Sequence, residues 1–228
     1  MSYSLNEALA LLLRPGTLSV IAGRPGMGAT SLAIQALRKA KSGRVLFFSL
    51  DKPAARIRER SGDPNWMIDD LGFLTTDMVR EALQERPEDD VAVVIDPLEL
   101  MWLPDSDRPR SKEREFHELT AALRSLARKY DVPIVCTAYL PRSLDVRNDR
   151  RPHLDSFAEK IGWRALASVD TVLLVYRSSY YNGCYNKTED HTAELYLAKN
   201  SAGGLAVITC CWAADNERGT LVFSEAEP

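Results

Sequence analysis

A glycine-rich run near the N-terminus has the residue types and the spacing of a phosphate-binding loop. It comprises Gly23, Arg24, Pro25, Gly26, Met27, Gly28, Ala29, Thr30 and Ser31. The pattern G-x-x-x-x-G-K-[ST] is met at every defined position except the lysine. Glycines let the backbone curl so that N–H groups converge on phosphate oxygens, and a helix that follows adds its positive N-terminal end. We therefore predict a site for ATP here, with Thr30 among the ligands of Mg²⁺.

A plain glycine turn is the alternative for this run. The run follows a stretch with the composition of a buried strand and precedes a stretch with the pattern of a helix, as a phosphate loop requires. This context favours the phosphate loop.

Position 29, where the pattern has lysine, is occupied by alanine. The lysine reaches the β- and γ-phosphates and stabilises charge on the transferring group, so its loss should weaken binding and weaken turnover further. Arg24 or Lys52 could supply a replacement cation, and the sequence does not decide between them. Alanine is also the usual substitution for disabling such a loop, so the sequence is compatible with a natural or an introduced Ala29.

Two acidic residues each follow an apolar run with the composition of a buried strand. Asp96 ends the run at 91–96 and has the form of a Walker B acid, which holds Mg²⁺ directly or through water. Alternatively, Asp96 is an ordinary aspartate in the turn that ends a strand, and the Pro97 that follows it fits a turn as well. Asp51 follows the run at 45–50 and could orient an attacking water. It could equally cap a helix that starts near Pro53.

Strand-like and helix-like segments alternate along the chain, which predicts an α/β fold: a mostly parallel twisted sheet with helices on both faces. Strands are predicted at 17–22, 44–50, 91–96, 132–137 and 171–176, and helices at 4–13, 29–41, 53–60, 75–86 and 112–130. The segments 61–71 and 140–153 are predicted to be loops. Antiparallel strands at 192–199, 204–212 and 219–224 should close one edge. We expect a single domain over 1–228, with an N-terminal helix in 1–14, a core over 15–176 and the antiparallel strands and tail in 177–228.

The composition narrows the classes of partner. The net charge of −3 excludes a uniformly basic nucleic-acid binder, so any such surface must be local. One candidate is the segment with Arg142, Arg147, Arg150 and Arg151, whose alternative is a solvated loop. No apolar run approaches the roughly 20 residues of a membrane span, and the N-terminus lacks a signal-peptide pattern, so we expect a cytoplasmic protein without membrane contact.

The cysteine pattern does not indicate a zinc site. Cys136, Cys184, Cys210 and Cys211 form no C-x-x-C pair. We expect reduced thiols, with Cys210 and Cys211 on opposite faces of a strand.

Several segments, in the same order along nearly the whole chain, resemble motifs of the motor domain of DnaB-type replicative helicases. They are 13–31 (LRPGTLSVIAGRPGMGATS), 45–53 (VLFFSLDKP), 94–101 (VIDPLELM), 140–152 (LPRSLDVRNDRRP), 169–177 (VDTVLLVYR) and 198–204 (AKNSAGG). The resemblance implies a RecA-like P-loop fold. RadA-like and KaiC-like ATPases of the same group share the pattern near Lys199 and Asn200.

The resemblance also implies an assembly and a ligand. Its members form a homo-oligomeric ring or filament, a hexamer among them, with ATP at the interfaces and single-stranded DNA in the central channel. A helicase or another replication protein is the implied protein partner. The four arginines of 142–151 would then lie on or near the DNA-facing loop.

Four positions matter for catalysis by this resemblance. Lys199 would remain as a trans-acting cation, whereas Ser201 stands where a trans-acting arginine is expected. Asp51 stands in place of a catalytic glutamate, and Tyr139 in place of a polar sensor that is usually glutamine. We therefore expect a nucleotide- or single-stranded-DNA-binding module with little or no ATPase activity. The alternatives are an active ATP-dependent helicase or translocase of the DnaB type and a KaiC-like regulatory ATPase.

Overall fold

The computed structural model describes residues 3–40, 43–85, 91–103, 111–181 and 191–226. Its strands are β1 (Leu18–Gly23), β2 (Arg44–Ser49), β3 (Trp66–Asp69), β4 (Val91–Asp96), β5 (Ile134–Tyr139), β6 (Thr171–Tyr176), β7 (Thr192–Asn200), β8 (Ala206–Asp215) and β9 (Thr220–Glu225). They form one sheet in the order β3-β2-β4-β5-β1-β6-β7-β8-β9. Pairing is parallel from β3 to β6 and antiparallel from β6 to β9. The predicted mostly parallel sheet with an antiparallel edge is confirmed.

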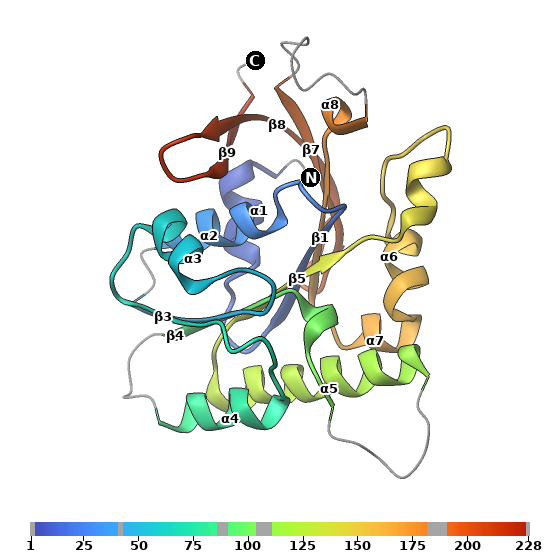
Figure 1. Ribbon diagram of the computed structural model, residues 1–228. Coiled ribbons are helices and arrows are strands. Elements are labelled where there is room, and N and C mark those ends of the chain that lie inside the picture. The colour runs from blue at the N-terminus through green and yellow to red at the C-terminus, as the bar shows by residue number, and fades with distance from the viewer. Residues whose placement is uncertain (1–2, 41–42, 86–90, 104–110, 182–190, 227–228) are drawn as a thin grey trace.

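Helices cover both faces of this sheet (Figure 1). They are α1 (Leu5–Leu11), α2 (Ala29–Ala40), α3 (Ala54–Ser61), α4 (Thr76–Gln84), α5 (Lys112–Tyr130), α6 (Leu154–Ile161), α7 (Trp163–Ala167) and α8 (Ser178–Tyr181), with short 3-10 helices η1 (Leu98–Leu100) and η2 (Arg142–Val146). None of the helices in the described part of the chain combines the length and apolar composition of a membrane span.

Successive side chains of the central strands point to opposite faces of the sheet and pack into two separate cores. Leu46 and Phe48 of β2 point into the core that α4–α7 cover. Val45 and Phe47 point into the core that α1–α3 and the C-terminal strands cover. Because both faces are buried, the parallel strands are continuous apolar runs rather than alternating ones, which is why the sequence indicated them well.

The fold differs from the sequence-based expectation in the segments 61–71, 140–153 and 154–167. The segment 140–153, predicted to be a loop, contains the 3-10 helix η2. The segment 61–71, predicted to be a loop, contains the short edge strand β3, which pairs with β2. Trp66 of β3 is buried and stacks on Phe47 with ring centroids 6.0 Å apart. Packing of one aromatic side chain therefore holds a strand that a four-residue pattern does not reveal. Helices α6 and α7 were also not predicted, although Phe157 and Ile161 of α6 are buried at helical spacing.

The antiparallel hairpin β8–β9 reaches back across α2, the helix that follows the glycine-rich run. Phe223 is fully buried, and a Cβ atom added at Gly28 would lie 2.7 Å from its ring. The side-chain amide of Gln35 on α2 donates to the carbonyl of Phe223 over 2.6 Å and accepts a hydrogen bond from the Phe223 N–H over 2.9 Å. The C-terminal strands thus fix the start of α2 from the side.

The described cysteines behave as predicted. Cys136, Cys210 and Cys211 carry free thiols. Cys210 is buried and Cys211 is half-buried, as neighbours on opposite faces of β8 should be. Cys184 lies outside the described residues.

Candidate functional site

A cavity of about 350 Å³ opens at the carboxyl ends of the central parallel strands. The glycine-rich run, the ends of β4 and β5, the residues after β2 and the turn between β8 and β9 all line it. The strand register brings these segments together, since Ser49 is level with Asp96 and Gly23 is level with Tyr139. Ligands of open α/β sheets bind at this edge, so the cavity is the candidate site.

The glycine-rich run has the curled backbone that a phosphate loop needs. Gly26 and Gly28 have φ values of +84° and +107°, in the region that favours glycine. The N–H of Met27 donates to the carbonyl of Arg24 over 3.0 Å, and the buried Met27 side chain anchors the loop. Helix α2 begins at Ala29, so its N-terminal end opens into the cavity.

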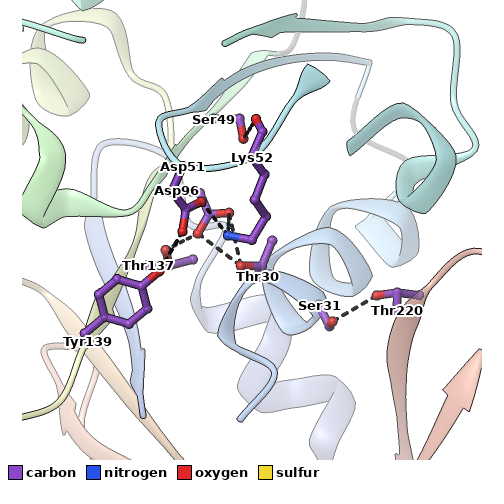
Figure 2. Close-up of polar contacts among 9 residues, drawn as sticks. All are labelled: Thr30, Ser31, Ser49, Asp51, Lys52, Asp96, Thr137, Tyr139 and Thr220. Carbon is purple, nitrogen blue, oxygen red and sulfur yellow. Dashed lines mark hydrogen bonds and ion pairs between the residues drawn. The ribbon is translucent and has the colours of Figure 1, made fainter. Parts of the chain in front are cut away.

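The carboxylate of Asp96 is the centre of the polar network in the cavity (Figure 2). The hydroxyl of Thr30 lies 3.0 Å from each of its oxygens. The hydroxyl of Thr137 donates to Oδ1, and the ammonium of Lys52 lies 3.2 Å from Oδ2. Burying a carboxylate is costly unless donors satisfy it, and donors from three separate segments do so here.

Thr30 and Asp96, the two predicted ligands of Mg²⁺, lie together. A threonine hydroxyl and a carboxylate are the oxygen donors that Mg²⁺ prefers. In the part of the chain that the structure describes, no three His, Cys, Asp or Glu side chains gather as a metal cage. Mg²⁺ at this position would therefore complete its coordination with phosphate oxygens and water, as it does with a nucleotide. The residues fit a magnesium–nucleotide complex.

Asp51 also lies in the network, and it does not cap α3. Its Oδ2 accepts a hydrogen bond from the Tyr139 hydroxyl over 2.7 Å, and its Oδ1 contacts the Lys52 ammonium at 2.6 Å. The first N–H of α3, from Ala54, instead donates to Asp70 over 2.7 Å. Burial, followed by the contact with Asp51, raises the pKa of Tyr139, so the phenol stays a protonated donor.

Among the residues that the structure describes, two cations outside the glycine-rich run line the cavity, Lys52 and Arg60. Arg60 was not singled out by sequence reasoning, because a polar helix does not reveal which of its faces lies over a neighbouring loop. Burial, and next the nearby Arg56, lowers the pKa of Arg60, while Asp96 and Asp51 oppose this shift.

Arg24 belongs to the glycine-rich run but is bound elsewhere. Its Nε and Nη2 contact Asp145 at 3.1 Å and 2.7 Å, and its Nη1 donates to the carbonyl of Leu140 over 3.0 Å. The guanidinium therefore ties the phosphate loop to η2.

Lys199 lies away from this cavity. It is level with Val172 near the start of β6, whereas the phosphate loop follows the end of β1, the neighbour of β6. Its ammonium donates to the carbonyl of Leu166 over 2.7 Å, and burial lowers its pKa despite the nearby Asp170. Within one protomer Lys199 therefore cannot contact phosphate in the cavity, and its action on a neighbouring protomer stays a prediction.

Several of the candidate DNA-binding arginines have partners within the chain. Arg151 makes a two-pronged contact with Glu194, with Nε–Oε2 and Nη2–Oε1 distances of 2.9 Å. Arg150 lies 4.9 Å from the ring centre of Tyr181, and Arg147 donates to Ser156 over 3.1 Å. Arg142 is exposed on η2. Their role in DNA binding stays a prediction.

Comparison with known proteins gives a family and a fold. The model of the family "DnaB-like helicase C terminal domain" matches residues 55–219. "Replicative DNA helicase DnaB" of Pasteurella multocida (strain Pm70) is 27% identical over 231 residues, which cover 84% of this chain and 48% of that protein. The chain spans about half the length of the curated relatives it matches.

Two solved structures share the architecture. "The Structure Of A DnaB-Like Replicative Helicase And Its Interactions With Primase" superposes with a TM-score of 0.77 at 20% identity, and the match covers 94% of this chain and 60% of that one. "Crystal structure of the RadB recombinase" gives 0.66 at 14% identity, with 99% and 98% covered. At these identities the likeness shows the fold, and the predicted RecA-like fold is confirmed.

Glu99, three residues after Asp96 in the sequence, allows a test of this site through the pH dependence of folding stability. Its Oε1 accepts the backbone N–H of Tyr139 over 2.6 Å, while its buried Oε2 has no hydrogen-bond partner among the described residues. Burial raises the pKa of Glu99, and the Tyr139 N–H opposes this only in part. An acid whose pKa is raised on folding costs stability as the pH rises above its unfolded pKa, and the cost reaches its full size above the folded pKa.

We predict that Glu99→Gln increases the free energy of unfolding at pH 7, because a neutral amide still accepts the Tyr139 N–H and carries no buried charge. The gain should shrink as the pH falls through the folded pKa of Glu99 toward its unfolded value of about 4.3. Urea unfolding at several pH values measures this. Glu81→Gln, on the exposed face of α4, is the control and should change stability little. A wild-type chain more stable than Glu99→Gln at pH 7 would contradict the prediction.

Proposed function

Because the chain belongs to the DnaB-like helicase C-terminal domain family, we propose that it is a nucleotide-binding module of the DnaB type that binds ATP with Mg²⁺ and hydrolyses it slowly or not at all. The single observation that carries the proposal is the combination at the start of α2. The curled loop and the Thr30–Asp96 pair are retained, and alanine occupies the position of the loop lysine.

Binding is supported by groups that need no loop lysine. The run Gly23–Ser31 offers backbone N–H groups and the N-terminal end of a twelve-residue helix to phosphate oxygens. Thr30 and Asp96 would hold Mg²⁺, which when bound neutralises charge on the β- and γ-phosphates. Asp96 is kept in place by Thr137 from the neighbouring strand.

Two observations support slow hydrolysis: the contacts of Asp51, the acid that would orient water, and the lack of an arginine at position 201. The Tyr139 hydroxyl donates to one oxygen of Asp51 over 2.7 Å, and this hydrogen bond does not depend on where the Lys52 ammonium points, so that oxygen is not free to orient an attacking water. Ser201 lacks the charge of a trans-acting arginine, a group worth a factor of about 10³ or more in rate. Lys199, the other candidate, is engaged with Leu166.

An active ATP-dependent helicase or translocase is the second candidate function. The names of the curated relatives favour it, since the matched proteins are described as replicative DNA helicases. In that case an ATP-filled ring, a hexamer or another homo-oligomer, would move along single-stranded DNA. Under either candidate function, a replication protein would be the protein partner.

Single-stranded DNA would contact the segment 142–151 through phosphate. Arg142 is exposed and available. Arg147 would exchange its exposed, 3.8 Å contact with Glu159 for phosphate oxygens, and an ion pair of that kind is weak. Arg151 would have to leave its two-pronged contact with Glu194 to do the same. Binding should then lack sequence preference and weaken with salt.

We predict that wild-type protein binds a fluorescent ATP analogue more tightly with Mg²⁺ than in EDTA, and that Thr30→Val removes this difference. Valine keeps the shape of threonine but has no oxygen for the metal. Fluorescence titration of both proteins in both buffers is the measurement. Thr76→Val, in the first turn of α4, is the matched control. Absence of any binding by the wild type would rule out the proposed function, and equal affinity in the two buffers would remove Mg²⁺ from it.

For the DNA contact we predict that changing Arg142, Arg147, Arg150 and Arg151 to alanine weakens single-strand binding. It should also flatten the dependence of log affinity on log salt, by roughly 0.7 for each lost phosphate contact. The control removes the same charge elsewhere, by changing Arg80, Arg114, Arg128 and Arg164 on α4, α5 and α7. An unchanged affinity and salt slope in the first variant would refute the contact.

A further inference from the structure

The candidate nucleotide site lacks a positive charge at one defined point. A phosphate loop normally places an ammonium over the terminal phosphates from the first residue of its helix, and here that residue is Ala29. Among the described residues that line the cavity, the cations are Arg24, Lys52 and Arg60. Within the described part of one protomer, a cation that replaces the loop lysine has to be one of these three.

Arg24 is the least available of the three. Three of its nitrogen atoms are engaged with Asp145 and Leu140, and its side chain is only 11% exposed. Moving it to phosphate would break the two-pronged ion pair that holds the phosphate loop to η2.

Lys52 approaches the loop from across the cavity. The turn between β2 and α3 carries it and is pinned at two points: the Ser49 hydroxyl donates to the Lys52 carbonyl over 2.7 Å, and the Leu50 N–H donates to the Asp96 carbonyl over 2.8 Å. From this turn the side chain extends toward Thr30, the residue directly after Ala29 (Figure 2). Lys52 Nζ and Thr30 Oγ1 lie 3.2 Å and 3.0 Å from the same oxygen of Asp96.

We propose that Lys52 supplies the phosphate-binding ammonium that position 29 lacks, so that the charge of the phosphate loop comes from the turn after β2. This inference rests on the proposed nucleotide binding at the same loop. The Lys52 ammonium contacts two carboxylates, at 2.6 Å from Asp51 and 3.2 Å from Asp96. Its side chain is 26% exposed, and a lysine stem is flexible with rotatable donors, so the ammonium can turn to phosphate oxygens beside Thr30.

Arg60 provides a second cation on the same side of the cavity. It stands at the end of α3, the helix that begins just after Lys52. Its Nε is buried and has no hydrogen-bond partner among the described residues, and the residue lines the cavity. Lys52 and Arg60 thus line the same cavity as the N-terminal end of α2.

The test is a charge-relocation cycle on the intact chain, read as the affinity for a fluorescent ATP analogue. We expect Lys52→Met, which keeps the length of the side chain, to weaken binding by about tenfold to a hundredfold, as loss of a charged hydrogen bond does. Ala29→Lys in the Lys52→Met background should restore the affinity to within about threefold of wild type, since either position then serves the same phosphates. Lys112→Met, at the exposed first residue of α5, is the matched control and should not change binding.

A second measurement on wild-type protein does not depend on a variant's folding. Acetylation of Lys52 by an amine-reactive reagent, followed by mass spectrometry, should be slowed by ATP more than by AMP, while Lys112 is labelled equally with either. Equal affinity of Lys52→Met and wild type, or equal labelling of Lys52 with and without ATP, overturns the inference alone. A wild-type chain that binds no analogue overturns the proposed function and this inference with it.

Discussion

The rest of the site depends on the contacts that satisfy the buried carboxylate of Asp96. It sits at the end of a central strand, where an unpaired charge would be costly. Three donors relieve that cost: Thr30 from the start of α2, Thr137 from β5 and Lys52 from the turn after β2. Each donor reaches it only if its strand or helix is in the observed register. The carboxylate therefore couples the geometry of the phosphate loop to the order of the sheet.

The packing around this network explains how the site keeps the shape of a phosphate loop without a lysine at position 29. The loop curls because of Gly26 and Gly28, and the β8–β9 hairpin packs Phe223 against Gly28 from outside. Neither feature requires a lysine at position 29. Positive charge instead arrives with Lys52 and Arg60, where it balances the carboxylates of Asp51 and Asp96. We propose that such a site binds nucleotide better than it hydrolyses it, because the Tyr139 hydroxyl engages the acid that would orient water.

Sequence patterns predicted the fold where they were long and apolar. The bounds of β4, β6 and α5 agree with the predicted 91–96, 171–176 and 112–130, because fully buried strands and a long amphipathic helix leave a clear pattern. The edge strand β3 was missed, since it depends on one tertiary contact, that of Trp66 with Phe47. In the site, the motif predicted the pairing of Thr30 with Asp96. It could not choose between Arg24 and Lys52, because the direction of a side chain is decided by partners distant in sequence, here Asp145 and Asp96.

The most direct measurement is phosphate release at a concentration of Mg²⁺–ATP that saturates the binding measured on the same sample, with and without single-stranded DNA. If the site binds nucleotide but has lost its catalytic charges, saturable binding will be accompanied by release no faster than that of Asp96→Asn. Release that DNA stimulates and that Asp96→Asn abolishes would contradict this, and it would show that the relocated cations support an active motor.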